Sequence, residues 1–295
     1  MIQIGFDIGG TNIKAGVLDD QFNILAENVR PFPRGENPKK VLDIMVDMVS
    51  QLLSLAKFKN EDISSIGVAV PGTLDTENEV VLDAYNLGFH QFPLKELLEE
   101  KFPGIPILLA NDANAAALGE LYKGAFFGCK TAILFTLGTG VGGGLILGGK
   151  LFNGGMNHGV ELGHVRLIHD GPLCTCGNRG CIETVCSAKF FENQGLEAKE
   201  VIDKAKAGDQ QSLEIFHEYL GYLSDAIVSV SMLLDPEVIA LGGGISKAGD
   251  FLFDPLRTLI KEKSFFKFPH KTVPTELGNT AGFVGAAILG KEKNI

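Results

Sequence analysis

The apolar residues of this chain follow two spacings, one typical of strands and one typical of helices. Short apolar runs bounded by glycine, proline or acidic residues predict strands at 2–8, 13–18, 22–29, 63–70, 105–109, 132–137, 142–147 and 150–152. Apolar residues at intervals of three and four predict helices at 41–55, 94–101, 113–121, 198–207, 212–234 and 280–289. Strands and helices alternate along most of the chain, and this order favours an α/β fold.

One stretch near the start of the chain recurs at an offset of 129 residues. The offset aligns Gly9 with Gly138 and Leu18 with Leu147, so that a strand, a glycine turn and a second strand match in order. A match of this kind is typical of a duplicated structural unit.

A second match lies further along the chain, where residues 66–72 and 238–244 each form an apolar strand that runs into a turn. Two such correspondences predict two similar α/β domains that face each other across a central cleft. We expect the first domain to span 1–110 with a C-terminal helix at 280–295, and the second to span 111–279 with an irregular loop at 158–186.

The two glycine turns each stand between short predicted strands. Such turns can serve simply as hairpins, which need residues with positive φ. Two matched turns favour anion binding instead, because glycine lets backbone N–H groups approach and face a phosphate. Asp7 at the end of the first strand can hold Mg²⁺, and Lys14 can add a positive charge. The candidate residues of the turns are Gly9, Gly10, Thr11, Gly138, Thr139 and Gly140.

Asn111 and Asp112 stand where a predicted strand ends and an alanine-rich helix begins. Either residue can serve as the N-cap of that helix. A carboxylate at this place also points into the crevice where open α/β sheets bind ligands, and there it can accept a proton from a hydroxyl group. The pattern leaves both interpretations open.

Three cysteines, Cys174, Cys176 and Cys181, lie within eight residues of one another, and His164 precedes them by ten. Three thiolates and one imidazole suit tetrahedral zinc. With all four positions taken by the protein, the zinc would be structural. The alternative is a group of reduced, buried cysteines without a metal.

Two acidic residues, Glu161 and Glu183, flank the cysteine cluster. Carboxylates accept paired hydrogen bonds from neighbouring hydroxyl groups, which is how a sugar is recognised. His164 can give one ring nitrogen to zinc and donate its other N–H to the same ligand. The alternative is that both acids are solvated surface residues.

The net charge of −10 limits the kinds of molecule that the protein is expected to bind. We expect so acidic a chain to bind neither a nucleic-acid backbone nor an anionic membrane. No basic leader precedes the first predicted strand at Ile2, and no apolar stretch reaches the length of a membrane span. A cytoplasmic protein is therefore expected, and in the cytoplasm its five cysteines should stay reduced.

Several segments, spread in order over nearly the whole chain, resemble the ROK family (repressors, open reading frames and sugar kinases) within the actin/hexokinase/Hsp70 superfamily. The resemblance implies two actin-like (ribonuclease H-like) domains with a central interdomain cleft. It also implies transfer of the γ-phosphate of ATP to the 6-hydroxyl of a hexose. The segments are DIGGT at 7–11, NDAN at 111–114, LGTGVG at 137–142, ELGH at 161–164, CTCGNRGCIE at 174–183, LGGGI at 241–245 and GFVGAA at 282–287.

The resemblance carries residue roles with it, and Asp112 is the implied catalytic base. The implied sugar-binding residues are Gly72, Asn86, Asn111, Asp112, Glu161, His164 and Glu183. ATP and Mg²⁺ would be bound by Asp7, Gly9, Gly10, Thr11, Lys14, Gly138, Thr139 and Gly140, with Gly242, Gly243 and Gly244 near the adenosine. The implied zinc ligands are His164, Cys174, Cys176 and Cys181.

The identity of the sugar is less closely specified. The loop at 85–89 resembles that of bacterial glucokinases, with Tyr and Phe where Pro and Trp are common, so glucose is the expected substrate. N-acetylmannosamine and N-acetylglucosamine are the alternatives, and the different cysteine loop of the fructokinase branch disfavours fructose. Because the chain lacks a concentrated basic track, ATP is expected as donor in preference to polyphosphate.

A sugar-binding transcriptional regulator is the alternative from another functional class. Such family members carry a helix-turn-helix ahead of the kinase-like body, whereas six residues precede Asp7 here. The charge also argues against DNA binding, so we expect a sugar and ATP as partners. The resemblance suggests a homodimer.

Overall fold

The computed structural model describes residues 1–33, 38–266 and 270–292. The chain forms two compact units, which are treated separately. The first unit comprises Met1–Phe127, Lys150–Val160 and Asn279–Ile295, and the second comprises Gly128–Gly149 and Glu161–Gly278. Within the described ranges, no helix is both long and apolar enough to span a bilayer.

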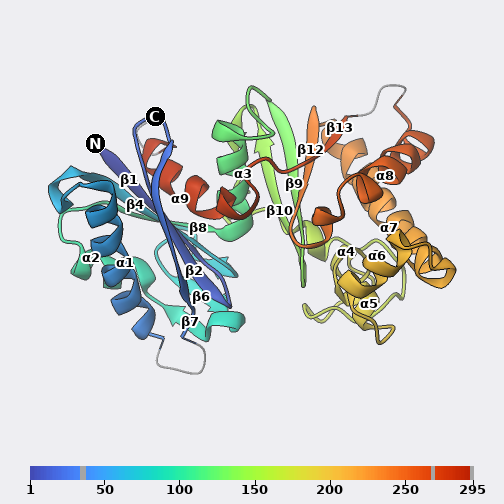
Figure 1. Ribbon diagram of the computed structural model, residues 1–295, viewed down its shortest axis with the longest axis horizontal. Helices are drawn as coiled ribbons and strands as arrows, with labels where there is room; N and C mark the ends of the chain where they lie inside the picture. Colours follow the sequence, from blue (N-terminus) through green and yellow to red (C-terminus); the bar gives the residue numbers. More distant parts are fainter. Residues whose placement is uncertain (34–37, 267–269, 293–295) are drawn as a thin grey trace. The chain divides into compact units, whose positions relative to one another are not determined.

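The first unit is built on a five-stranded sheet with the strand order β3-β2-β1-β4-β8. Strand β1 is antiparallel to β2 and parallel to β4, and β4 is parallel to β8. The strands are β1 (Ile2–Ile8), β2 (Asn12–Leu18), β3 (Ile24–Pro31), β4 (Ile63–Val70) and β8 (Ile107–Asn111). Helices α1 (Lys40–Ala56) and α2 (Leu94–Lys101) cover one face, and α3 (Asp112–Lys123) and α9 (Ala281–Glu292) cover the other (Figure 1).

A small antiparallel sheet follows β4 in the chain and was not predicted from the sequence. Its strands are β5 (Thr73–Leu74), β6 (Val81–Ala84) and β7 (Phe89–Phe92). A 3₁₀ turn at Tyr85–Leu87 connects β6 to β7. Phe89 and Phe92 stack with ring centroids 4.5 Å apart and join the main core, which explains why such short strands are held in place.

The second unit contains a sheet in which β10, β9, β12 and β13 follow one another in that order. The strands are β9 (Thr131–Leu137), β10 (Val141–Leu147), β12 (Val238–Gly242) and β13 (Lys271–Pro274), and the short β11 (Lys150–Leu151) comes after β10 in the chain. The helices are α4 (Ile182–Cys186), α5 (Lys189–Glu192), α6 (Ala198–Lys206), α7 (Gln210–Leu234) and α8 (Asp250–Lys263).

The two sheets share a topology, with a β-hairpin followed by parallel strands, as the internal repeat predicted. The aligned positions need a correction of one residue after the first turn. Gln3 pairs with Leu18 in the first hairpin, and the equivalent Ala132 pairs with Ile146 in the second. Leu18 therefore corresponds to Ile146 and not to Leu147, because the second hairpin has a turn one residue shorter.

The second match carries a similar shift of one residue. Ile4 pairs with Ile66 in the first sheet, and the equivalent Ile133 pairs with Ile239 in the second. Ile66 therefore corresponds to Ile239 and not to Val238. Sequence comparison without the strand register had no means of fixing this alignment.

Helix α9 lies unusually close to the sheet and to α3 because the contact is lined by glycine. A Cβ atom on Gly5 or on Gly67 would lie 1.8 Å from a carbonyl oxygen of α9. A Cβ on Gly285 would lie 1.6 Å from the carbonyl oxygen of Ala115 in α3. The backbones therefore touch without intervening side chains, and dispersion contacts are gained along the whole seam.

The same packing corrects the predicted domain boundary at residue 110. Residues 111–127 belong to the first unit because α3 packs on α9, and residues 150–160 also belong to it. The predicted loop at 158–186 is thus divided between the units at Val160. Residues 281–292 of the predicted C-terminal helix form α9, and residues 293–295 lie outside the described ranges.

Replacing Gly285 by alanine is expected to destabilise the protein by about 1–3 kcal/mol, because the added methyl group must push α3 away from α9. Gly221 in α7 is the matched control, because a Cβ there would meet nothing within 4 Å. Alanine at that helical position should stabilise by up to about 1 kcal/mol. Urea unfolding midpoints of the two variants should therefore move in opposite directions, and an unchanged midpoint for Gly285→Ala would contradict the packing described.

Candidate functional site

The carboxyl ends of three parallel strands meet at one edge of the first unit's sheet. Asp7 lies opposite Ala69 across β1 and β4, and Val70 lies opposite Asn111 across β4 and β8. Asp112 follows Asn111 as the first residue of α3. Because neighbouring strands lie about 4.8 Å apart, β1 and β8 are separated by about 10 Å. The structure therefore brings Asp7 and Asp112 to the same sheet edge with a single strand between them.

Asp7 is paired with Lys14, which lies directly opposite it on β2. The ammonium Nζ of Lys14 is 3.4 Å from Oδ2 of Asp7, and it also donates to the carbonyl oxygen of Asn279. Burial raises the pKa of Asp7, and the charge of Lys14 opposes this effect without cancelling it. The Gly9-Gly10-Thr11 turn follows at once and is closed by a hydrogen bond from Gly9 N to the carbonyl oxygen of Asn12.

Asn111 provides the N-cap of α3, a role that the sequence left open between Asn111 and Asp112. Its Oδ1 accepts hydrogen bonds from Ala113 N at 2.9 Å and Asn114 N at 3.2 Å. Its Nδ2 donates to the carbonyl oxygen of Gly72 at 3.1 Å. Asp112 is consequently the first helical residue, where a carboxylate is favoured by the helix dipole.

The other predicted sugar contact of the first unit, Asn86, lies in the 3₁₀ turn between β6 and β7. Its side chain is exposed, as is the neighbouring Tyr85. Asn111 and Gly72 are therefore joined directly by a hydrogen bond, and Gly72 packs against Asp83 and Ala84, which come just before the turn that carries Asn86.

In the second unit two glycine segments lie at one sheet edge. The turn at Gly138–Gly140 connects β9 to β10. The segment from Gly242 to Gly244 begins at the last residue of β12, which is parallel to β9. Gly243 has a φ of +89°, and a Cβ there would lie 2.3 Å from the carbonyl oxygen of Leu137. Only glycine fits this place, so the backbone after β12 passes directly against the end of β9.

Glu183 at the start of α4 has a buried carboxylate with contacts on both oxygens. Oε2 accepts a hydrogen bond from Val141 N at 3.3 Å, while Oε1 accepts one from Thr175 Oγ1 at 3.1 Å and pairs with the ammonium of Lys189. Burial alone would raise the pKa of Glu183, but the hydrogen bond and charge of Lys189, together with the hydrogen bonds from Thr175 and Val141, outweigh burial, so the pKa is lowered and the group is ionised at neutral pH. Neither Thr175 nor Lys189 was identified from the sequence, because no residue spacing signals such a contact.

The four predicted metal ligands gather in one place, with their ligand atoms all within 4.8 Å of one another. Tetrahedral zinc with Zn–S bonds of about 2.3 Å places two sulfurs about 3.8 Å apart, and a sulfur and a nitrogen about 3.6 Å apart. The Sγ atoms of Cys176 and Cys181 are 3.7 Å apart, and Sγ of Cys174 is 3.5 Å from Nδ1 of His164. The donor set thus fits a tetrahedral metal in both chemistry and spacing.

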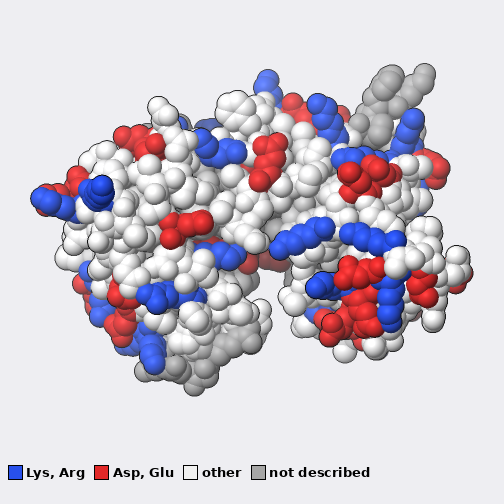
Figure 2. Space-filling view, viewed as in Figure 1, with Lys and Arg blue, Asp and Glu red and all other residues white. Residues whose placement is uncertain are grey.

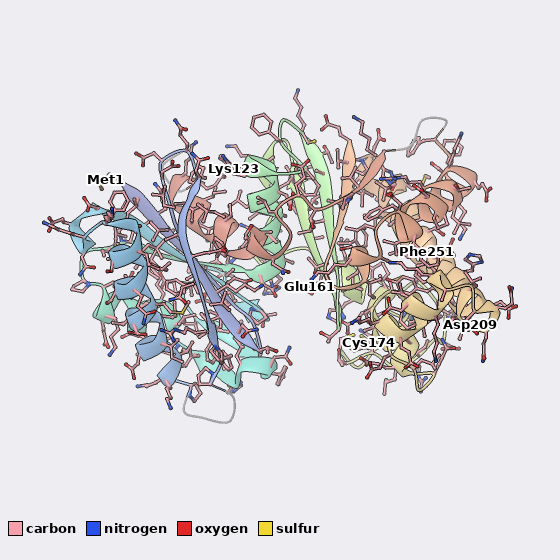
Figure 3. All side chains as sticks on the ribbon, viewed as in Figure 1. Met1, Lys123, Glu161, Cys174, Asp209 and Phe251 are labelled. Carbon is pink, nitrogen blue, oxygen red and sulfur yellow. The ribbon has the colours of Figure 1, made fainter. Side chains whose placement is uncertain are left out.

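His164 points its second ring nitrogen toward Glu161, with Nε2 lying 3.9 Å from the carboxylate oxygen Oε2. The Glu161 side chain is half exposed, so it can accept hydrogen bonds from a bound molecule. Glu161 and Cys174, both labelled in Figure 3, belong to the second unit. Of the sequence-predicted acids, Glu161 is thus available at the surface, and Glu183 is engaged by protein groups.

Comparison with known proteins supports one relationship over the whole chain. The family model described as the ROK family matches residues 3–293. A glucokinase of Halalkalibacterium halodurans is 34% identical over 317 residues, covering 98% of this chain and 95% of that protein.

Solved structures give the same result. A ROK family glucokinase of Streptomyces griseus, in complex with glucose and AMPPNP, is 32% identical, with a TM-score of 0.82 and coverage of 99% of this chain and 100% of that one. A ROK hexokinase of Thermus thermophilus is 30% identical, with a TM-score of 0.86 and coverage of 100% and 99%. The predicted actin-like α/β fold is therefore confirmed, and the chain belongs to the ROK family of sugar kinases and their relatives.

Proposed function

We propose that this protein is an ATP-dependent hexokinase that transfers the γ-phosphate of ATP to the 6-hydroxyl of glucose. The observation that carries the proposal is the shared sheet edge of Asp7, with its glycine turn, and Asp112, with the Asn111–Gly72 contact beside it. A base and a phosphate-binding turn at one edge are what phosphoryl transfer to an alcohol requires. Full-length similarity to glucokinases supports glucose as the acceptor.

In this proposal Asp112 orients the sugar 6-hydroxyl and accepts its proton as the phosphoryl group arrives. Asn111 fixes Asp112 by capping α3 and orders the loop at Gly72. The proposed sugar-binding residues are Gly72, Asn86, Asn111, Asp112, Glu161, His164 and Glu183.

The proposed nucleotide-binding residues lie in the glycine segments of the two sheets. In this proposal the backbone of the turns approaches the phosphate oxygens with little reorganisation, because hydrogen bonds from Gly9 N to Asn12 and from Gly138 N to Gly140 already form the turns. Asp7 is the residue proposed to hold Mg²⁺, which when bound neutralises charge on the phosphate oxygens, and Lys14 adds a cation beside it. The segments are Gly9, Gly10 and Thr11, then Gly138, Thr139 and Gly140, and, toward the adenosine, Gly242, Gly243 and Gly244.

We further propose that His164, Cys174, Cys176 and Cys181 bind a structural zinc ion, on the strength of the sulfur and nitrogen spacing. The cytoplasm is the proposed compartment, because ATP is available there and thiols stay reduced. A homodimer is proposed from the family resemblance alone. On the face seen in Figure 2, Lys and Arg lie among Asp and Glu, which favours ATP over a polyanionic polyphosphate as donor.

A panel of sugars tested with ATP in a coupled ADP assay checks this proposal. Glucose should give the highest kcat/KM, with mannose, fructose, N-acetylmannosamine and N-acetylglucosamine behind it. An extra N-acetyl group needs room that a glucose pocket does not leave, so the N-acetyl sugars should fall at least about tenfold lower. Turnover confined to the N-acetyl sugars would replace glucose as the substrate, and DNA retention without any turnover would replace the enzyme class.

A further inference from the structure

The Gly138–Gly140 turn is held at both ends by the segment that begins with Glu183. Val141 N, just after the turn, donates to Oε2 of Glu183 at 3.3 Å. At its other end, the carbonyl oxygen of Gly138 accepts a hydrogen bond from Ala188 N at 2.9 Å. A Cβ on Gly140 would lie 2.4 Å from Oε2 of Glu183, so the carboxylate fills the space that a side chain would occupy.

The other carboxylate oxygen of Glu183, Oε1, is contacted by Thr175 and Lys189, and the Cys174 thiol lies 3.9 Å from it. Thr175 Oγ1 donates to Oε1 at 3.1 Å, and Thr175 lies between Cys174 and Cys176 of the proposed metal cluster. The ammonium of Lys189 pairs with the same oxygen, and its side chain is 28% exposed whereas that of Glu183 is 11% exposed. A carboxylate so deeply buried is tolerated only with a charged partner and hydrogen bonds on both oxygens.

The path of Lys189 toward Glu183 is fixed by its own backbone. Lys189 N donates to Ser187 Oγ at 3.1 Å, and Ser187 Oγ donates to the carbonyl oxygen of Glu183 at 2.6 Å. Glu183 and Lys189 are therefore joined through both backbone and side chain. The segment from 183 to 189 links the cysteine cluster on one side to the glycine turn on the other.

We propose that Lys189 is a positioning residue for the phosphate donor: through Glu183 it holds the Gly138–Gly140 turn in the conformation that binds ATP. The inference rests on the proposed nucleotide role of that turn. Thr175 supports the same carboxylate from the cysteine cluster, so the metal loop serves the donor turn as well as the sugar. Glu183 thereby acts on the nucleotide side of the reaction, beyond the sugar contact assigned to it.

The test replaces Lys189 by methionine, which keeps the aliphatic stem and removes the ammonium. Without its cation, Glu183 loses its hold on Val141 N, and kcat/KM for ATP should fall about 10- to 100-fold, with the larger change in KM for ATP. KM for glucose at saturating ATP should rise by a smaller factor than KM for ATP, although Glu183 is also among the proposed sugar-binding residues. AMPPNP titrated by calorimetry, with no turnover involved, should show the same weakening.

Three further variants test whether the effect of Lys189→Met comes from the loss of the ammonium group. Lys189→Arg restores a cation and should recover most of the ATP affinity, whereas a purely steric role would not favour arginine. Thr175→Val should weaken ATP binding in the same direction by a smaller factor. Lys204→Met is the matched control, because Lys204 forms an exposed pair with Glu200 in the same unit and should leave both KM values unchanged.

The outcomes separate the inference from the proposed function. A wild-type protein that phosphorylates glucose, together with a Lys189→Met variant in which only the glucose KM rises, would assign Lys189 to the sugar and overturn the inference. A Lys189→Met variant with unchanged KM values for both ATP and glucose would overturn the inference as well. A wild-type protein without kinase activity toward any sugar would instead remove the proposed function.

Discussion

Replacing Asp112 by asparagine is expected to lower kcat by about 10²–10⁴-fold while leaving the affinity for glucose nearly unchanged. An amide can hydrogen-bond the 6-hydroxyl but cannot accept its proton at neutral pH, so the proposed step loses its base while the sugar keeps its contacts. The cap of α3 comes from Asn111 and is not altered by the change. Steady-state kinetics and calorimetry with glucose measure the two quantities separately.

Asp250 provides the matched control, because it is also the first residue of a helix, α8. Asp250→Asn makes the same chemical change at the same helical position and should leave kcat unchanged. Both variants lose a favourable charge near a helix N-terminus, so each should lose no more than about 1 kcal/mol of stability. If Asp112→Asn retains turnover within about tenfold of the wild-type value, Asp112 is not the general base.

The elements that the sequence predicted best are those whose signal is local. Strand β4 has the predicted bounds because it is a buried apolar run that ends at Pro71-Gly72, and α2 has them because its leucines recur at helical intervals. The sheet of β5, β6 and β7 was missed because its strands are two to four residues long, too short for any period to appear. What holds it is aromatic contact with a distant core, which no local pattern reports.

The predicted domain boundary failed for a related reason. Residues 113–121 read correctly as a helix, yet their placement depends on Gly285, which lies far away in the chain. In the sequence alone, a glycine inside a helix indicates only lower helix propensity. The structure shows that Gly285 is needed there because the backbone of α3 lies against it. Long-range close packing of this kind decides which unit a helix joins, and single-sequence patterns do not encode it.

The residues of the candidate site also differ in how far local sequence patterns predict them. The spacing of Cys174, Cys176 and Cys181 was enough to predict a cluster, because these ligands come from one short loop. The pairing of Lys189 with Glu183 was not predicted, since a lysine six residues after a glutamate has no preferred contact in an irregular segment. The sequence identifies residues with a distinctive spacing, such as the cysteines of the cluster. The structure is needed to show which common residues, such as Lys189, contact the candidate site residues.

Replacing Cys181 by serine is expected to abolish metal binding and to lower the melting temperature of the protein. Protein purified without chelator should contain about one zinc per chain, and the variant should contain less than about a tenth of that. Structural zinc in small domains contributes roughly 10–16 kcal/mol of binding free energy, and loss of even a third of this value would lower the melting temperature by about 5–15 °C. Cys181 is fully buried, so no exposed ligand can take its place.

Cys129→Ser is the matched control, because Cys129 is outside the cluster and half-buried, and it should change neither the zinc content nor the melting temperature by much. A chelator added to the wild-type protein should reproduce the loss of stability without any mutation, which separates the effect of the metal from the effect of the substituted side chain. Zinc that is merely adventitious would be removed without a change in melting temperature. A wild-type protein that is metal-free, folded and fully active would show that the thiols and His164 hold the loop by themselves, and the four ligands would then be a reduced polar cluster and not a metal centre.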